Sequence, residues 1–243
     1  MNLILVAPDE LDAGQRVVLT DHRARHIREV LRKSRGDTVR VGVLNGRLGT
    51  AALLETNEQQ VRLACIWSGA IPDPPQVDLL LALPRPKVLK RLWAQLAAIG
   101  VRRIILTNAA KVERCYFDSH VIDPAFYTPL LIEGLQQAGD THIPQVHVFR
   151  RFRPLIEDRL DVLCPNGQRT VLDPGAMAPL RVEKTDEPLL LAIGPEGGWT
   201  PFEVSLLEKH RFLPARLPLR TVRSDTACIA ALTLAHAHAL RGD

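Results

Sequence analysis

The chain has 243 residues, of which 46% are hydrophobic, and it carries a formal net charge of +4. This length allows one large domain or two small ones, and the hydrophobic content is ample for a core. The four cysteines are widely scattered and form no Cys-x-x-Cys pair, so we expect neither a disulfide framework nor a metal site.

The amino terminus does not resemble a targeting segment. The apolar run Met1–Val6 is followed at once by Pro8, Asp9 and Glu10, which makes it too short for the apolar region of a signal peptide. No apolar run approaches the length that crosses a membrane. We therefore expect a cytoplasmic protein with no membrane partner.

A helix with an apolar side and a basic side is predicted before residue 36. Thr20 or Asp21 can cap its start. Ile27, Val30 and Leu31 then follow at the spacing of a buried stripe. This stripe predicts that one side of the helix packs on a core.

Arginines occupy another face of this predicted helix, namely Arg25, Arg28, Arg32 and Arg35. Between Arg16 and Arg47 there are nine lysines and arginines but only three acids. Arginine favours phosphate through its planar fork of donors, so we expect these four to bind the backbone of an RNA. An ordinary solvated face is the alternative, as it is for most surface charge runs.

Short strands and then a linker follow. Residues 40–44 and 49–54 are predicted strands around Asn45-Gly46, the strongest short hairpin signal, and 61–66 is a third. Three prolines among residues 72–75 cannot continue a helix or a central strand. We therefore predict a small β-barrel over residues 1–70, a proline-rich linker over 71–76 and a second domain over 77–243.

Strands and helices alternate beyond the linker. The predicted strands are 77–83, 103–106, 146–149, 169–172, 189–193 and 215–217. The predicted helices are 87–99, 124–138, 154–160, 201–210 and 225–240. Such alternation predicts an α/β domain with a mostly parallel sheet and helices on both of its faces.

A glycine-rich bend follows the buried strand 189–193. Residues 194–199 read Gly-Pro-Glu-Gly-Gly-Trp, and Thr200 to Glu203 then matches a capping box with proline at the first helical position. The glycines permit backbone conformations and close approaches that any side chain would obstruct. A turn without chemistry is the alternative, so this loop needs support from elsewhere in the chain.

A second motif precedes the alanine-rich helix at the end of the chain. Residues 217–227 have the form Leu-x-x-Arg-x-x-Arg-x-Asp-Thr-Ala. Together the two motifs resemble the bacterial family that methylates N3 of a uridine in 16S ribosomal RNA, which belongs to the trefoil-knotted (SPOUT) methyltransferases. The first motif matches without a gap, and the second matches at Leu217, Arg220, Arg223, Thr226 and Ala227.

The resemblance implies a fold, a cofactor and partners. The α/β domain would contain a deep trefoil knot and follow a PUA-like RNA-binding barrel. The cofactor would be S-adenosylmethionine, the partner 16S ribosomal RNA or the small ribosomal subunit, and the assembly a homodimer through the knotted domain. The knot depends on the resemblance alone, because knotted chains are rare and periodicity cannot show one.

The resemblance also implies that three loops form the cofactor pocket, each after a strand. The expected cofactor-binding residues are Leu172, Asp173, Pro174, Ile193, Gly194, Pro195, Gly197, Gly198, Leu217, Leu219, Arg220, Val222 and Thr226. Methyl transfer is a displacement, so alignment of the nucleophile, methyl group and leaving sulfur contributes much of the acceleration.

Glu196, Arg223 and Asp225 are the candidate catalytic residues. Uracil N3 carries a proton at neutral pH and must lose it to become a good nucleophile. Arg223 could stabilise negative charge on the uracil carbonyls, and Asp225 could accept the proton or orient Arg223. Asp225 also fits the N-cap of the last helix, and Glu196 could bond loop amides, so structural roles remain open for both.

Some positions depart from the family pattern. Pro218 replaces the usual glycine, Asp225 the usual glutamate and Asp140 the usual arginine. Besides a uridine N3-methyltransferase, two interpretations therefore remain: a related RNA methyltransferase with another target nucleotide, and a noncatalytic RNA-binding or ribosome-assembly protein. The intact glycines of the 194–198 loop argue against the last of these.

Overall fold

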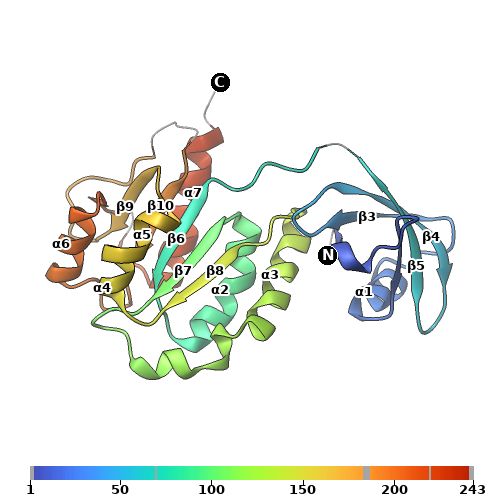
Figure 1. Ribbon diagram of the computed structural model, residues 1–243, viewed down its shortest axis with the longest axis horizontal. Helices are drawn as coiled ribbons and strands as arrows, with labels where there is room; N and C mark the ends of the chain where they lie inside the picture. Colours follow the sequence, from blue (N-terminus) through green and yellow to red (C-terminus); the bar gives the residue numbers. More distant parts are fainter. Residues whose placement is uncertain (1–2, 69, 183–186, 219, 241–243) are drawn as a thin grey trace. The chain divides into compact units, whose positions relative to one another are not determined.

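The computed structural model describes residues 3–68, 70–182, 187–218 and 220–240. The chain forms two compact units (Figure 1). The first contains residues 1–74 and 132–143, and the second contains residues 75–131 and 144–243. Within the described residues, no helix is both long and apolar enough to cross a membrane.

A five-stranded sheet forms the first unit, in the order β1–β3–β4–β5–β2. Strands β1 and β3 are parallel, and the other neighbours are antiparallel. The strands are β1 (Ile4–Val6), β2 (Arg16–Leu19), β3 (Thr38–Val43), β4 (Leu48–Thr56) and β5 (Val61–Trp67). The last three confirm the predicted strands, whereas β1 and β2 are too short for periodicity to predict. Alternate strand residues form an apolar core on one side of the sheet.

The β3–β4 hairpin turns at Asn45 and Gly46, as predicted. Asn45 has a left-handed φ of +55°, and the N–H of Gly46 donates to the carbonyl of Val43 at 2.8 Å. Residues about a hundred positions later hold this turn, because the N–H of Asn45 donates to the carbonyl of Thr141 at 2.8 Å. The Thr141 hydroxyl donates to the carbonyl of Gly46 at the same distance. Residues 132–143 therefore pack with the first unit.

The predicted basic helix is shorter and less regular than expected. It begins at α1 (His22–Arg25), capped by Asp21 as predicted, and continues as a π-helical turn (His26–Val30) in which Leu31 N–H donates to His26 carbonyl. The wider turn changes the direction of the side chains that follow it. Ile27 is buried as predicted, but Val30 is 65% exposed, so its assignment to the buried stripe was wrong.

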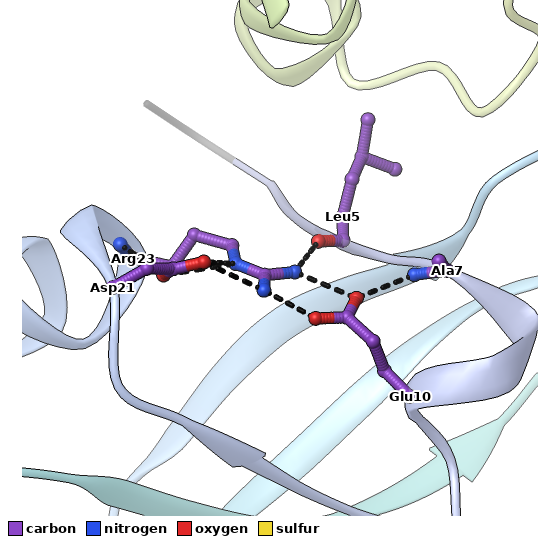
Figure 2. A network of polar contacts seen from close by, with 5 residues as sticks. All are labelled: Leu5, Ala7, Glu10, Asp21 and Arg23. Atoms are coloured by element: carbon purple, nitrogen blue, oxygen red, sulfur yellow. Dashed lines mark hydrogen bonds and ion pairs between the residues drawn. The ribbon is translucent and has the colours of Figure 1, made fainter.

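An ion-pair network fastens α1 to the chain before β2 (Figure 2). The Arg23 guanidinium donates to Asp21, to Glu10 and to the Leu5 carbonyl, the last at 2.8 Å. The hydrogen bond from Arg23 lowers the pKa of Glu10. Glu10 also accepts from the N–H of Ala7 at 2.7 Å. Arg23 is therefore a structural arginine.

A six-stranded parallel sheet forms the second unit, in the order β11–β9–β10–β6–β7–β8. The strands are β6 (Val77–Ala82), β7 (Arg103–Thr107), β8 (Gln145–Phe149), β9 (Gln168–Leu172), β10 (Leu189–Ile193) and β11 (Leu213–Ala215). The predicted parallel sheet is confirmed. Strand β11 lies two residues before its predicted position, because its ladder with β9 begins at Leu213 opposite Thr170.

Helices connect these strands. The longer ones are α2 (Pro86–Ile99), α3 (Pro124–Ala138), α6 (Pro201–Lys209) and α7 (Ser224–Leu240). The predicted helix 154–160 is part of a longer helical stretch of α4 (Phe152–Pro154), a π-helical turn (Leu155–Arg159) and α5 (Leu160–Leu163). Short 3-10 turns occur at Pro8–Glu10, Arg114–Asp118 and His120–Ile122.

Helices cover both faces of the parallel sheet, as predicted (Figure 1). Helices α2 and α7 pack against each other, and α7 also packs on β10. On the other face, the helical stretch 152–163 and α6 bury apolar side chains such as Ile156 and Leu207 against Leu80 and Leu190. Helix α2 ends at Gly100, whose φ of +95° is typical of a glycine cap.

Candidate active site

Three loops meet at the carboxyl ends of neighbouring strands in the second unit. They are residues 173–180 after β9, 194–200 after β10, and 216–218 with 220–223 after β11. The loops enclose a cavity of about 180 Å³. Its lining is Leu172, Asp173, Pro174, Ile193, Gly194, Pro195, Glu196, Gly198, Arg216, Leu217, Arg220, Thr221, Val222, Ser224 and Ala227. Ligands of open parallel sheets bind at this edge.

Most of the predicted cofactor-binding residues line this cavity. Gly197 and Thr226 do not, and Leu219 lies outside the described residues. Among the candidate catalytic residues, Glu196 lines the cavity, whereas Arg223 and Asp225 do not. Four lining residues were not predicted, namely Arg216, Thr221, Ser224 and Ala227. All four lie within or beside the second motif, so its position in the chain was the available signal.

Two glycines of the 194–200 loop are constrained for different reasons. A Cβ on Gly194 would lie 3.1–3.3 Å from the ring of Trp199, which is tighter than ordinary contact. A Cβ on Gly198 would meet no atom within 4 Å, but its φ of +71° disfavours other residues. Trp199 packs on Phe152 with ring centroids 5.4 Å apart. The loop is therefore shaped by a close approach at one end and a left-handed residue at the other.

The predicted capping box at the start of α6 is present and extends further than its motif shows. Glu203 is buried, and one carboxylate oxygen accepts from the N–H and the hydroxyl of Thr200 at 2.7 and 2.8 Å. The other oxygen accepts from the N–H of Ala110 at 2.7 Å. In addition, the Lys111 ammonium donates to the carbonyl of Gly197 at 2.6 Å. The loop after β7 thus holds the 194–200 loop, which no local motif indicates.

The two flanking loops are held by their own hydrogen bonds. The Asp173 carboxylate accepts from the N–H of Gly175 at 2.9 Å, so this side chain shapes the first turn after β9. The N–H of Arg216 donates to Ala178 carbonyl at 2.8 Å, and Leu180 N–H donates back to Arg216 carbonyl at 2.8 Å. These two loops are therefore joined to each other by backbone hydrogen bonds along the cavity.

Asp225 lies one residue inside α7, which begins at Ser224 rather than at the predicted Asp225. One carboxylate oxygen lies 3.2 Å from the guanidinium of Arg91, on α2, and the other lies 3.7 Å from Nε of Arg223. The same carboxylate accepts from the N–H of Thr226 at 3.0 Å. Asp225 therefore belongs to an ion-pair network that joins α2 to α7, and Arg91 is a further member that sequence reasoning missed.

The predicted arginine face of the first unit is not a single face. Arg32 has a left-handed φ of +50° and ends the helix, so Arg32 and Arg35 do not continue the side formed by Arg25 and Arg28. Arg25, Arg32 and Arg35 are exposed, while Arg28 is half-buried and its Nη1 has no hydrogen-bond partner. Among the described residues, no acid forms an ion pair with any of the four.

Metal ligands do not gather in the described part of the chain. His22 and His26 are four residues apart, yet no group of three or more histidine, cysteine, aspartate or glutamate side chains there could hold a metal ion. Cys65, Cys115, Cys164 and Cys228 are free thiols. Burial raises the pKa of Cys164 to about 11, which keeps that thiol protonated at neutral pH.

Comparison with known proteins agrees with this geometry. A family model described as an RNA methyltransferase domain matches residues 72–236. The ribosomal RNA small subunit methyltransferase E of Treponema pallidum is 30% identical over 255 residues, covering 98% of this chain and 92% of the relative. Ribosomal RNA small subunit methyltransferase E 1 of Borreliella burgdorferi is 24% identical and covers 95% of both chains.

Solved structures share the whole fold. One is a ribosomal RNA small subunit methyltransferase E from Neisseria gonorrhoeae bound to S-adenosyl methionine, with a TM-score of 0.77 at 19% identity over 96% of this chain and 95% of that one. A Legionella pneumophila protein solved with the cofactor SAM gives a TM-score of 0.75 at 21% identity over 97% of both chains. These likenesses confirm the predicted fold class, a knotted α/β domain preceded by a PUA-like barrel. Because the family model spans more than half of the chain and a 30% identical relative aligns along nearly all of it, the chain belongs to the RNA methyltransferase family that includes the ribosomal RNA small subunit methyltransferases E.

Proposed function

We propose that this protein transfers the methyl group of S-adenosylmethionine to N3 of a uridine in 16S ribosomal RNA. The observation that carries the proposal is the cavity that three loops enclose, in a chain that belongs to an RNA methyltransferase family. Both motifs that suggested the reaction contribute to this cavity, through Gly194 and Gly198 in one case and Leu217 and Arg220 in the other.

The cavity fits the cofactor chemically. Its apolar lining includes Leu172, Ile193 and Val222, which suit the faces of an adenine, and charged residues lie beside them. Gly194, which lines the cavity, is in such close contact with the Trp199 ring that a side chain there would press on it. S-adenosylmethionine, when bound, supplies a methyl group on a positively charged sulfur. The loop residues then have to bind it, hold its orientation and keep its methyl facing the RNA.

Proton transfer is assigned to Glu196 in this proposal. N3 of uracil carries a proton at neutral pH, so a carboxylate near the cavity has to accept it as the nitrogen attacks. Glu196 lines the cavity and is exposed, and no hydrogen bond joins its side chain to another described residue. Arg223 would stabilise negative charge on the uracil carbonyls, and Asp225 would orient Arg223 through their 3.7 Å contact.

Binding of the RNA is assigned in part to the first unit. Arg25, Arg28, Arg32 and Arg35 supply guanidinium groups that no described acid neutralises, and such groups bind phosphate oxygens. Their placement on two sides of the turn at Arg32 suits an extended backbone rather than one helical face. The partner in this proposal is 16S ribosomal RNA or the small ribosomal subunit, met in the cytoplasm.

A homodimer through the second unit is also proposed. Helix α7 already buries Cys228, Ala231, Leu232 and Ala235 within one chain. Its remaining small and apolar side chains, which include the half-buried Ile229, are available to a second copy. Analytical ultracentrifugation measures the mass in solution, and a monomer at all concentrations would reject the dimer.

The reaction is tested with small ribosomal subunits from a strain that lacks the gene. We expect the purified protein and S-adenosylmethionine to convert one uridine of their 16S RNA to 3-methyluridine, as read by mass spectrometry of nucleosides. Methylation of another nucleotide would indicate a related enzyme. Binding of the subunit without any methyl transfer or cofactor binding would indicate a noncatalytic assembly protein.

A further inference from the structure

A second cavity lies in the first unit, apart from the candidate active site. It has a volume of about 340 Å³ and lies where the amino ends of the parallel strands β1 and β3 meet the segment after the π-helical turn. Pockets that hold small ligands are typically larger than about 300 Å³. The lining is Leu3, Ile4, Leu31, Lys33, Thr38, Val39 and Arg40. None of the four arginines assigned to RNA above lines this cavity, so it is a separate feature of the first unit.

The cavity combines an apolar wall with two positive charges. Its four apolar residues are buried or pack against the core of the unit. Lys33 is half-buried, and Thr38 and Arg40 are exposed. The apolar side chains therefore form the inner wall, and the polar side chains lie nearer to the solvent.

Acids do not neutralise these two charges. Among the described residues, no acid forms an ion pair with Lys33 or Arg40. Asp37 accepts from a backbone N–H within its own turn at 2.9 Å. The Arg40 guanidinium lies beside Gly139, where a Cβ would be 3.7 Å from its Nη2, and the adjacent Asp140 accepts from two backbone N–H groups. Two cations without an acid partner beside an apolar wall indicate a ligand that is both anionic and partly apolar.

Backbone hydrogen bonds hold the segment that carries Lys33. The N–H of Lys33 donates to the carbonyl of Ile27 at 3.1 Å. The N–H of Gly36 donates to the carbonyl of Leu53 at 2.9 Å, and the N–H of Leu53 donates back to the carbonyl of Asp37 at 2.9 Å. The cavity is therefore formed before any ligand binds, and binding does not have to order this wall.

A nucleotide has the required combination of a charged phosphate and a base with apolar faces. The planar fork of Arg40 suits phosphate oxygens, and Lys33 adds a compact positive charge. In a duplex the base is stacked and paired, so only an unpaired nucleotide can place its base against protein side chains. We infer that the wall of this cavity binds the base of one unpaired nucleotide of the RNA, while Lys33 and Arg40 bind its phosphate. The inference rests on the proposed function in taking RNA as the partner, and it adds a site apart from the methylated uridine.

The surroundings of the cavity favour a single strand over a free nucleotide. Arg32 and Arg35 are exposed on the same segment, on either side of Lys33 in the sequence, and can contact neighbouring phosphates. Apart from the two cations, the lining side chains offer a base edge only the hydroxyl of Thr38. Such a site accepts any base, as is usual where a strand is bound by its phosphates and by the faces of its bases.

The test is fluorescence anisotropy with a labelled oligouridylate and with the duplex that it forms with oligoadenylate. Thr38→Trp fills the cavity from an exposed strand position. We expect it to weaken binding of the single strand by at least about fivefold, the low end for one stacked base, and to leave duplex binding within about twofold. Val18→Trp, at an exposed position of β2 on the opposite edge of the sheet, is the matched control and should change neither affinity. Both variants should keep the melting temperature.

A pair of double variants tests the two charges. Lys33→Gln with Arg40→Gln removes two positive charges at the cavity, and Arg16→Gln with Arg62→Gln removes two exposed ones elsewhere in the unit. We expect the first pair to weaken binding of the single strand about tenfold more than the second, because it removes hydrogen bonds to a charged phosphate. Equal losses would reduce the effect to general attraction and overturn the inference.

The remaining outcomes are equally decisive. A folded Thr38→Trp variant that binds the single strand normally, or that loses single strand and duplex to the same extent, would overturn the inference. Free uridine monophosphate that binds as tightly as the oligouridylate would assign the cavity to a small ligand instead. If Thr38→Trp does not fold, the charge variants decide. A protein that binds the single strand through this cavity but methylates no uridine would refute the proposed function and leave the inference standing.

Discussion

The buried carboxylate of Glu203 accepts a hydrogen bond from the backbone N–H of Ala110 at 2.7 Å. Its other oxygen binds Thr200 at the start of α6, so one side chain joins the 194–200 loop to the loop after β7. These loops follow β10 and β7, and the first of them carries Glu196, to which the proposed function assigns the proton of uracil N3. Their relative position therefore depends on a residue that touches neither ligand.

Glu203→Gln is expected to destabilise the second unit and to weaken cofactor binding. Glutamine keeps one acceptor but turns an amide donor toward groups that are themselves donors. Hydrogen bonds to a charged group contribute about 1.5–3 kcal/mol, so we expect the free energy of unfolding to fall by about 2 kcal/mol. Urea unfolding measures this, with Glu208→Gln as the exposed control on the same helix. Equal stability of both variants would contradict the role of Glu203.

The two constrained glycines are expected to respond differently to substitution. Gly194→Ala places a methyl against Trp199, and overpacking of this kind costs about 1–3 kcal/mol, so affinity for S-adenosylhomocysteine should fall by at least about fivefold. Gly198→Asn should be tolerated better than Gly198→Val, because asparagine adopts a positive φ more readily than a β-branched residue. Calorimetry measures the affinities. Equal binding by all three variants would remove this loop from the cofactor site.

Local signals predicted much of this fold. Asn45-Gly46 makes its hairpin because both residues tolerate the turn, and Thr200 with Glu203 caps α6 because both partners lie within one helical turn. The alternation of strands and helices fixed the parallel sheet in the same way. Each of these depends on residues that are neighbours in the sequence.

The rest depends on contacts that no local pattern encodes. Thr141 binds the hairpin at Gly46, Lys111 binds Gly197, and Arg91 binds Asp225, all across long separations in the chain. The prediction of a single arginine face was wrong for a related reason. Periodicity alone continues the helix, whereas the left-handed φ at Arg32 ends it. Both motifs lie in loops that line the cavity, whereas no motif indicates the residues that hold these loops in place.

Reversing the charge of Arg25 and Arg32 to glutamate is expected to weaken RNA binding and to reduce its salt dependence. When a phosphate contact is lost, binding releases fewer counterions from the RNA. For a single strand, each lost contact therefore reduces the steepness of log affinity against log salt concentration by about 0.7. Cofactor affinity should not change. Reversing Arg16 and Arg62, which are exposed on β2 and β5, is the matched control. Equal slopes for both double variants would make the first pair an ordinary solvated surface.

Stability is expected to fall as the pH drops below about 6.5, the unperturbed pKa of histidine. Burial lowers the pKa of His147. The positive charge of Arg103 lowers this pKa further, and the negative charge of Asp78 opposes the shift. Burial also lowers the pKa of His236, against the hydrogen bond to Gly100 carbonyl. Because both folded pKa values lie below the unfolded one, the unfolded chain binds more protons, and the stabilisation present above pH 6.5 is lost on acidification.

Denaturant unfolding between pH 5 and pH 7.5 measures this loss. His147→Gln and His236→Gln should each flatten the dependence in that range, whereas His22→Gln, at an exposed position in α1, should leave it intact. Some acids, such as Glu10 and Asp161, also have lowered pKa values in the folded protein. Their unfolded pKa values are near 4, so they change the stability only below the pH range of this measurement. A pH dependence that neither buried variant alters would assign the effect to other groups.

The variant Asp225→Asn is expected to show whether Asp225 orients Arg223 or accepts the proton of uracil N3. Asparagine keeps the size of the side chain but loses its charge, and with it the ion pairs to Arg91 and Arg223. Since Asp225 does not line the cavity, we expect turnover to fall by about tenfold through a less well oriented Arg223. By contrast, Glu196→Gln should lower turnover by about a hundredfold or more, which is the usual scale for a lost general base.

Single-turnover rates on small subunits, measured across pH, distinguish the two roles. A positioning residue changes the rate but leaves the pH profile in place, whereas loss of the group that accepts the N3 proton removes its ionisation from the profile. Arg91→Met tests the network from its other side: it breaks the contact with α2, keeps the pairing of Asp225 with Arg223, and should leave turnover within about threefold of the unmodified rate. If Asp225→Asn lowers turnover by about a hundredfold and also alters the profile, while Glu196→Gln does neither, the proton acceptor is Asp225. The Asp225 carboxylate would then have to reach the uracil from the first turn of α7, where Ser224 and Ala227 line the cavity.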